Sequence, residues 1–142
     1  MSDLEANKRL VKEFFDCLGT FDAERLMKVL DPSITFNVPN IGCLGGKLTL
    51  ADLPMVASIL TAACPDGLRF EILDLTAEDD RVAARVDGFA KVAGGGEYNN
   101  RYHFLFNIRN GRICRTFEYM DSLLVENVLA ERTRQYRAGK SG

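Results

Sequence analysis

Three charged residues are placed so that they could share one site. Arg85 and Asp87 are two residues apart in a run of alternating side chains, so on a strand both point to the same face. Glu118 lies two candidate strands further along, about 10 Å away across the intervening strand. Two carboxyl groups in one apolar pocket cannot both ionise cheaply, so they would divide into an acid and a base. The alternative is an exposed Arg85–Asp87 pair on a solvated face, which contributes ~0–1 kcal/mol.

The neighbours of this pair divide between the two faces of the strand. Phe89 shares the face of Arg85 and Asp87, whereas the apolar residues that alternate with them point to the other face. The residues of that second face are Val82, Ala84, Val86 and Ala90.

Other reactive side chains are few. His103 is the only histidine and could act as a base near neutral pH, or it could lie at a surface or interface. The four cysteines, at positions 17, 43, 64 and 114, form no CxxC pair, so we expect reduced thiols and no metal site. The triplet Gly94-Gly95-Gly96 lacks a following Lys-Ser/Thr and helix, and it is interpreted as a hairpin loop rather than a phosphate cradle.

Helical periodicity dominates the first half of the chain. Apolar residues recur at helical spacing from Leu4 to Leu18, and Asp22 stands where the N-cap of a second helix belongs. That helix ends at Asp31-Pro32, and a third helix runs from near Thr49 to Pro65. Between them, residues 34–38 are expected to form a short strand.

From Gly67 onward the period changes to two. Four strands are predicted, with turn residues at 78–80, 94–96 and 110–111, and a last helix follows from Ser122 to about Tyr136, capped by Asp121. Helices followed by an antiparallel meander indicate an α+β domain in which the helices cover one face of the sheet. The predicted strands are 68–77, 81–92, 97–109 and 112–120.

Composition restricts the class of partner. The 142 residues are 46% hydrophobic and 27% charged, ordinary values for one globular domain, which we take as residues 1–142. A net charge of −2 gives no electrostatic footprint for nucleic acid or an anionic membrane. The acidic start MSDLEANKRL is not typical of a signal peptide, so a cytoplasmic location is expected.

The chain resembles the limonene epoxide hydrolases, within the wider nuclear transport factor 2-like and SnoaL-like group. The resemblance rests on four segments that span most of the sequence. It implies a cone-shaped α+β fold (cystatin-like) in which N-terminal helices pack on a curved antiparallel sheet enclosing a pocket. The segments are Glu13-Phe14-Phe15-Asp16-Cys17-Leu18 with Asp22, then Asn37-Val38-Pro39, Arg85-Val86-Asp87, and Gly111-Arg112-Ile113 with Glu118-Tyr119-Met120-Asp121.

The resemblance also implies a catalytic role for each polar residue of the site. Glu118 stands at the position of the base that deprotonates water, and Asp87 stands at the position of the acid that protonates the epoxide oxygen. Arg85 lies between the two carboxyl groups. Asn37 stands at the position of the amide that holds the water. Two positions differ from the family pattern, since Thr35 replaces a water-holding tyrosine and Glu118 replaces an aspartate. The expected substrate-binding residues are Phe15, Leu18, Thr35, Leu60, Phe89, Tyr102 and Met120.

Three functions therefore remain open. The first is an epoxide hydrolase that acts on a small apolar molecule without a cofactor. The second is an isomerase, dehydratase or polyketide-type cyclase that uses Asp87 or Glu118 as base. The third is a non-catalytic binding or dimerisation module. The apolar residues Leu105, Ile113, Phe117 and Tyr119 on the outer face of the last two strands further predict a homodimer, with His103 nearby.

The hairpin at Asn110-Gly111 decides which face carries Glu118. A two-residue type I′ turn would pair His103 with Glu118, whereas a type I turn with a bulge at Gly111 would pair Tyr102 with Glu118. Hydrophobic matching alone favours the first. Because the resemblance places Glu118 in the pocket with Arg85, we predict the second, with positive φ at Gly111.

Overall fold

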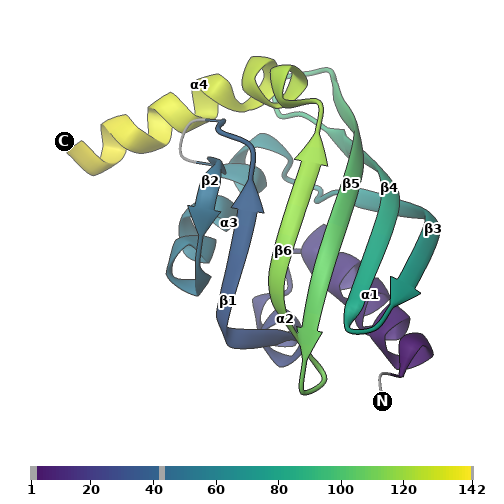
Figure 1. The fold of residues 1–142 in the computed structure, drawn as a ribbon. Coiled ribbons are helices and arrows are strands. Elements are labelled where there is room, and N and C mark those ends of the chain that lie inside the picture. The colour runs from purple at the N-terminus through teal and green to yellow at the C-terminus, as the bar shows by residue number, and fades with distance from the viewer. Residues whose placement is uncertain (1–2, 42–43, 142) are drawn as a thin grey trace.

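The computed structural model describes residues 3–41 and 44–141 of the chain, so that Cys43 lies outside the described residues. A six-stranded sheet in the order β2-β1-β6-β5-β4-β3 is covered on one face by helices (Figure 1). The helices are α1 (Leu4–Gly19), α2 (Ala23–Val29), a 3-10 turn (Leu50–Asp52), α3 (Leu53–Ala63) and α4 (Ser122–Ser141). The strands are β1 (Leu30–Val38), β2 (Gly46–Leu48), β3 (Arg69–Glu78), β4 (Arg81–Lys91), β5 (Glu97–Arg109) and β6 (Arg112–Met120).

The α+β class and the helical cover over one face of a curved sheet are confirmed. The sheet differs from the expected antiparallel one in that β1 runs parallel to β6, with Thr35 opposite Arg115 and Asn37 opposite Phe117. The short β2 then adds to the other edge of β1. Sequence patterns predict pairing across turns, whereas Asn37 and Thr116 are 79 residues apart, so no local signal marks their pairing.

Side-chain caps set the helix starts. Asp22 caps α2 as predicted, because its carboxylate accepts a hydrogen bond from the Arg25 N–H at 3.1 Å. Asp121 caps α4 in the same way, accepting from the Leu124 N–H at 3.1 Å. The helix α4 continues past its expected end at Tyr136.

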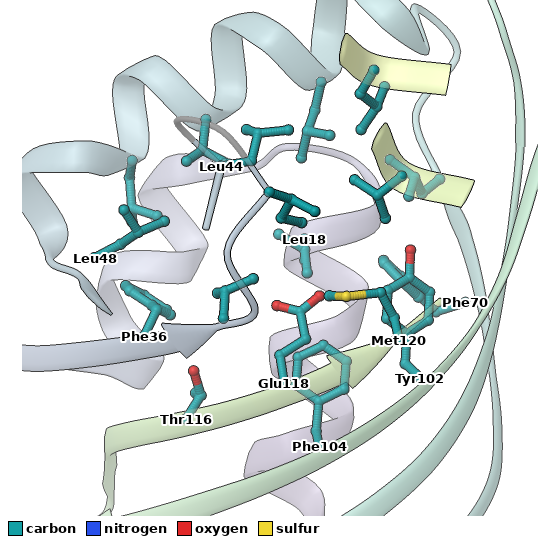
Figure 2. A pocket seen from close by; sticks show the side chains of 18 of the residues that line it. Leu18, Phe36, Leu44, Leu48, Phe70, Tyr102, Phe104, Thr116, Glu118 and Met120 are labelled. Carbon is teal, nitrogen blue, oxygen red and sulfur yellow. The ribbon is translucent and has the colours of Figure 1, made fainter. Parts of the chain in front are cut away.

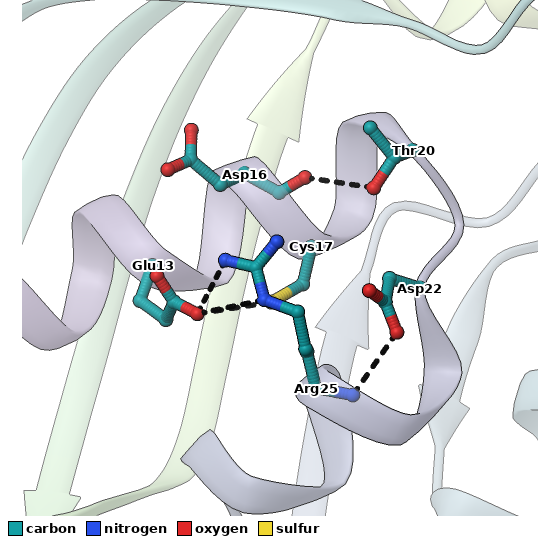
Figure 3. A network of polar contacts seen from close by, with 6 residues as sticks. All are labelled: Glu13, Asp16, Cys17, Thr20, Asp22 and Arg25. Atoms are coloured by element: carbon teal, nitrogen blue, oxygen red, sulfur yellow. Dashed lines mark hydrogen bonds and ion pairs between the residues drawn. The ribbon is translucent and has the colours of Figure 1, made fainter.

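A polar network fixes the corner between α1 and α2 (Figure 3). The Arg25 guanidinium donates to Glu13, with 3.1 Å between Nε and Oε1, and the Thr20 hydroxyl donates to the Asp16 carbonyl at 3.2 Å. The Arg25–Glu13 pair is exposed, so water screens its attraction and it contributes little to stability. It links two helices that both line the pocket.

Aromatic rings fill the space between α1 and the sheet. Phe14 and Phe15 of α1 make edge-on contacts with Phe104 and Phe106 of β5, with centroids 5.1–6.3 Å apart. On β4 the residues that face this core are small, and Ala84 lies opposite Phe104. The even-numbered residues of β4 and β5 therefore face the helices, and the odd-numbered ones face outward.

Candidate active site

An apolar cavity of about 140 Å³ opens between the helices and the concave face of the sheet. Residues from all four helices contribute to its wall, together with β1, β2, β3, β5 and β6 (Figure 2). Four of the expected substrate-binding residues, Leu18, Leu60, Tyr102 and Met120, line it. The other apolar lining residues are Phe14, Leu26, Phe36, Val38, Ile41, Leu44, Leu48, Leu53, Val56, Leu68, Phe70, Phe104, Val125 and Leu129.

Glu118 is the only charged side chain among the described residues that line this cavity. It projects from β6 into the pocket (Figure 2), because it lies directly opposite Phe104 on the inner face. Burial raises the pKa of Glu118 from 4.5 to about 7, since the apolar walls replace the water that would solvate its charge. A carboxyl group with this pKa is half ionised near neutral pH, which suits a general base.

Two tyrosines that line the pocket form a second polar group, together with an asparagine bonded to one of them. The hydroxyls of Tyr98 and Tyr102 are 2.9 Å apart, and Asn100 donates from Nδ2 to the Tyr98 hydroxyl at 3.0 Å. Burial is the main cause that raises the pKa of Tyr98, and it raises the pKa of Tyr102 well above 10. Both phenols are therefore neutral donors at physiological pH.

Arg85 and Asp87 do not join Glu118, so the predicted convergence is wrong. Arg85 lies opposite His103 on the outer face, where it forms an exposed ion pair with Asp74, with 2.8 Å between Nη2 and Oδ2. Asp87 shares that face and lies opposite Arg101. The small apolar neighbours of the pair face the core, and strand alternation then excludes Arg85 and Asp87 from the pocket.

Asn37 and Thr35 also face away from the cavity. They line a shallow polar depression on the outer face with Lys47 and Arg115, and the Asn37 amide donates to the Thr116 carbonyl at 3.0 Å. Their neighbours Phe36 and Val38 are the β1 residues that reach the pocket. The expected roles of Asn37 and Thr35 in this pocket are therefore wrong.

Two expected wall residues lie elsewhere. Phe15 is buried among Phe104 and Phe106 and does not line the cavity. Phe89 lies on the outer face, with the Arg69 guanidinium 4.4 Å from the centre of its ring. Each placement follows from the position in its element. Phe15 packs against the rings of β5, and Phe89 is an even number of residues from Arg85 on β4 and so points to the same outer face.

The register of the last hairpin combines parts of both alternatives. Asn110 and Gly111 have φ of 52° and 74°, as a type I′ turn requires, and Arg109 lies opposite Arg112. A bulge at Cys114 then shifts the pairing, so that Asn107 lies opposite Arg115. The predicted inward face of Glu118 is confirmed, as is the positive φ of Gly111. Three further predictions are wrong: the bulge at Gly111, the pairing of Tyr102 with Glu118, and a carboxylate on the Arg85 side. Glu118 lies opposite Phe104 instead.

Tyr98 and Asn100 were missed in the sequence. Their signal was alternation, since residues 98, 100 and 102 share one face of β5 and that face also carries Phe104, which lies opposite Glu118. Among the described residues no group of three His, Cys, Asp or Glu side chains is arranged to hold a metal ion. No helix in the described part of the chain is long and apolar enough to cross a membrane.

A family model described as the SnoaL-like domain matches residues 11–116. The match ends two residues before Glu118 and therefore covers most of the fold but not the candidate base. A search of curated proteins found no match.

Solved structures with similar folds share little sequence with the chain and indicate the fold alone. AclR from Streptomyces galilaeus, a proposed hydroxylase, is 19% identical with a TM-score of 0.74, over 91% of this chain and 98% of its own. IdmH from Streptomyces antibioticus, a proposed polyketide cyclase, is 16% identical with a TM-score of 0.71, over 89% and 96%. A proposed SnoaL-like polyketide cyclase from Jannaschia sp. CCS1 is 16% identical with a TM-score of 0.74, over 92% and 96%.

Proposed function

The chain belongs to the SnoaL-like domain family, and from this premise we propose that it is a small-molecule enzyme of the cyclase or isomerase type in which Glu118 is the general base. The observation that carries the proposal is a desolvated carboxyl group that is the only charged group among the described residues of a largely apolar pocket. With a pKa of about 7, Glu118 is basic enough to accept a proton from a weakly acidic C–H group, and about half of the molecules carry the ionised carboxylate at neutral pH.

The chemistry is proton transfer at carbon. The ionised carboxylate takes a proton from a carbon next to a carbonyl group, and the C–H electron pair moves into an enolate. Return of the proton to a different carbon gives isomerisation. Attack of the enolate carbon on a second carbonyl of the same molecule closes a ring instead, and the resulting alkoxide takes back the proton from Glu118. The similar folds of IdmH and the Jannaschia protein, both proposed polyketide cyclases, favour the ring-closing reaction.

The apolar lining of the pocket indicates the polarity of the substrate. Leucine, valine, isoleucine and phenylalanine side chains surround Glu118, so the substrate is a largely hydrocarbon or polycyclic molecule with few polar groups. Epoxide hydrolysis by the expected route would need Asp87 as acid and Arg85 as its support, and both lie on the outer face.

The test is proton exchange on 2-tetralone, an apolar two-ring ketone with an acidic C–H group, followed by NMR in D₂O. Wild-type protein should accelerate the exchange over the E118Q variant by about 10²–10⁴-fold, the usual contribution of a positioned base. D87N is the matched control, because it removes a carboxylate outside the pocket, and it should exchange at the wild-type rate. Equal rates in wild type and E118Q would contradict the proposal and favour a non-catalytic binding module.

A further inference from the structure

The side chain of Asn100 is held in one orientation by the backbone around it. Its Oδ1 accepts hydrogen bonds from the N–H groups of Arg101 at 2.8 Å and Asp121 at 3.2 Å. Its Nδ2 must then be the group that faces the Asp121 carbonyl, at 3.1 Å, and the Tyr98 hydroxyl, at 3.0 Å. The Tyr98 oxygen is therefore an acceptor that is already occupied by a fixed donor.

The hydroxyl protons of the pair can be counted. Tyr98 and Tyr102 carry two hydroxyl protons, and the bond between their oxygens, 2.9 Å apart, uses only one of them. The other proton is left to point into the cavity that both side chains line. The two side chains are only 3% and 7% exposed, so bulk water competes poorly for that proton.

One order of donation is favoured. In the chain Asn100→Tyr98→Tyr102, each hydroxyl accepts one hydrogen bond and donates one, and such chains strengthen each successive donor. In the reverse order the Tyr98 oxygen would accept twice while Tyr102 would accept from neither partner. The remaining donor is therefore the hydroxyl of Tyr102. Its residue lies opposite Met120, which is two residues along β6 from Glu118 on the same face of the sheet (Figure 2).

We propose that the Tyr98–Tyr102 pair is a subsite that binds the carbonyl oxygen of the substrate, with Tyr102 as the donor and Tyr98 as its positioning residue. The inference rests on the proposed function, because it assigns a binding site to the oxygen of the carbonyl group. That carbonyl group is next to the carbon from which Glu118 takes a proton. As the C–H pair moves into the new C=C bond, the carbonyl π pair moves to oxygen, and the Tyr102 O–H stabilises that negative charge without giving up its proton.

The protonation state of Tyr102 agrees with this role. Burial raises its pKa well above 10, so the phenol remains a neutral donor above the Glu118 pKa of about 7, where that carboxylate is ionised. The alternative is that the pair only links two positions, four residues apart, on the buried face of β5. A purely structural pair would not change the stretching frequency of the carbonyl group of a bound ligand, whereas a donor to that group would.

The experiment is the infrared carbonyl stretch of ¹³C-labelled 2-tetralone bound to wild type, Y102F, Y98F, E118Q and Y119F. A hydrogen bond donated to the carbonyl oxygen lowers the frequency of the carbonyl stretch relative to its value in cyclohexane. We expect the lowered stretch in wild type, return to the cyclohexane value in Y102F, and an intermediate value in Y98F, where Tyr102 keeps its proton but loses its polarising partner. Y119F is the matched control, since Tyr119 is 58% exposed on the outer face, and it should equal wild type.

The proton-exchange rate separates this subsite from the base. Removing one donor that stabilises a developing oxyanion lowers kcat by about 10²–10³-fold, which is the loss expected for Y102F. E118Q should lower the exchange rate by about 10²–10⁴-fold and still show the lowered carbonyl stretch. An unchanged exchange rate in E118Q, with the stretch lowered by Tyr102, would refute Glu118 as base and leave the subsite standing.

Three results would overturn the subsite. The first is a wild-type stretch equal to that in cyclohexane, or no saturable binding of the ketone. The second is a Y102F stretch equal to that of wild type. The third is a reversed order, in which Y98F alone loses the shift, because it would make Tyr98 the donor. Thermal unfolding of each variant checks that the fold is retained, since Tyr98 keeps its bond to Asn100 when Tyr102 is changed.

Discussion

Glu118 differs from the other carboxylates of the chain in its surroundings rather than in its chemistry. Asp74 and Glu13, for example, meet an arginine at the surface, whereas no described side chain donates a hydrogen bond to Glu118. The titratable groups of the pocket that interact with it are Tyr98 and Tyr102, which lie on the neighbouring strand β5 and are both neutral. Because nothing charged compensates the carboxylate, desolvation alone sets its affinity for a proton.

This isolation predicts a simple dependence of activity on pH. A base works only when it is ionised, so kcat/KM for exchange on 2-tetralone should rise tenfold per pH unit below about 7 and level off above it. The raised pKa of Tyr102 means that this donor stays protonated, so no fall is expected up to about pH 9. The measurement is the exchange rate from pH 3 to 9. A midpoint near 4.5, the ordinary value for glutamate, would show that Glu118 is solvated during turnover.

At the level of elements, local signals were predictable and distant ones were not. Asp22 and Asp121 were recognised as caps because a cap needs only the next three residues. The turn at Asn110-Gly111 was recognised for the same reason. The bulge at Cys114 was not recognised, because it depends on which residues of the strand meet the distant core. Ile113 and Glu118 are an odd number of residues apart, so both can face the core only if one extra residue lies between them.

The outward direction of Arg85 shows a different kind of error. Alternation correctly grouped Arg85, Asp87 and Phe89 on one face of β4. It could not say which face meets the helices, and the family resemblance assigned the wrong one. The buried small residues Val82 and Ala84 of the opposite face were the better physical indicator, since large aromatic side chains from β5 and α1 need small partners.

The pairing of β4 with β5 leaves no room at Gly88. A Cβ added there would lie 2.8 Å from the Tyr102 ring and 3.4 Å from that of Phe70. G88A should therefore push the Tyr102 ring aside, destabilise the fold by about 1–3 kcal/mol and lower exchange activity as Y102F does. Chemical denaturation and the exchange assay measure the two effects. G95A is the control, because a Cβ there meets no atom within 4 Å, although its positive φ costs some stability. Wild-type activity in G88A would mean that the precise position of Tyr102 is unimportant.

For the whole molecule, the outer face of the sheet still carries an apolar strip next to the polar depression. Leu105 lies opposite Phe117, and His103 lies opposite Tyr119, which is 58% exposed. Ile113, expected to belong to this strip, is fully buried in the core, because the bulge at Cys114 turns it inward. The strip is therefore smaller than the sequence predicted, and it ends at the charged residues Arg85 and Arg115.

A homodimer through this strip remains our prediction. Two copies related by a twofold axis would cover Leu105, Phe117 and Tyr119 with the same residues of the partner, so each apolar side chain gains a dry contact. Light scattering at micromolar concentration should give twice the 15.8 kDa chain mass. Replacement of Phe117 by glutamate should give a monomer, since it would bring two like charges together, whereas D74N at the edge of the sheet should remain a dimer. Because Phe117 and Glu118 point to opposite faces, the F117E monomer should keep the raised pKa of Glu118. A wild-type monomer would leave the strip without a partner copy and contradict the prediction.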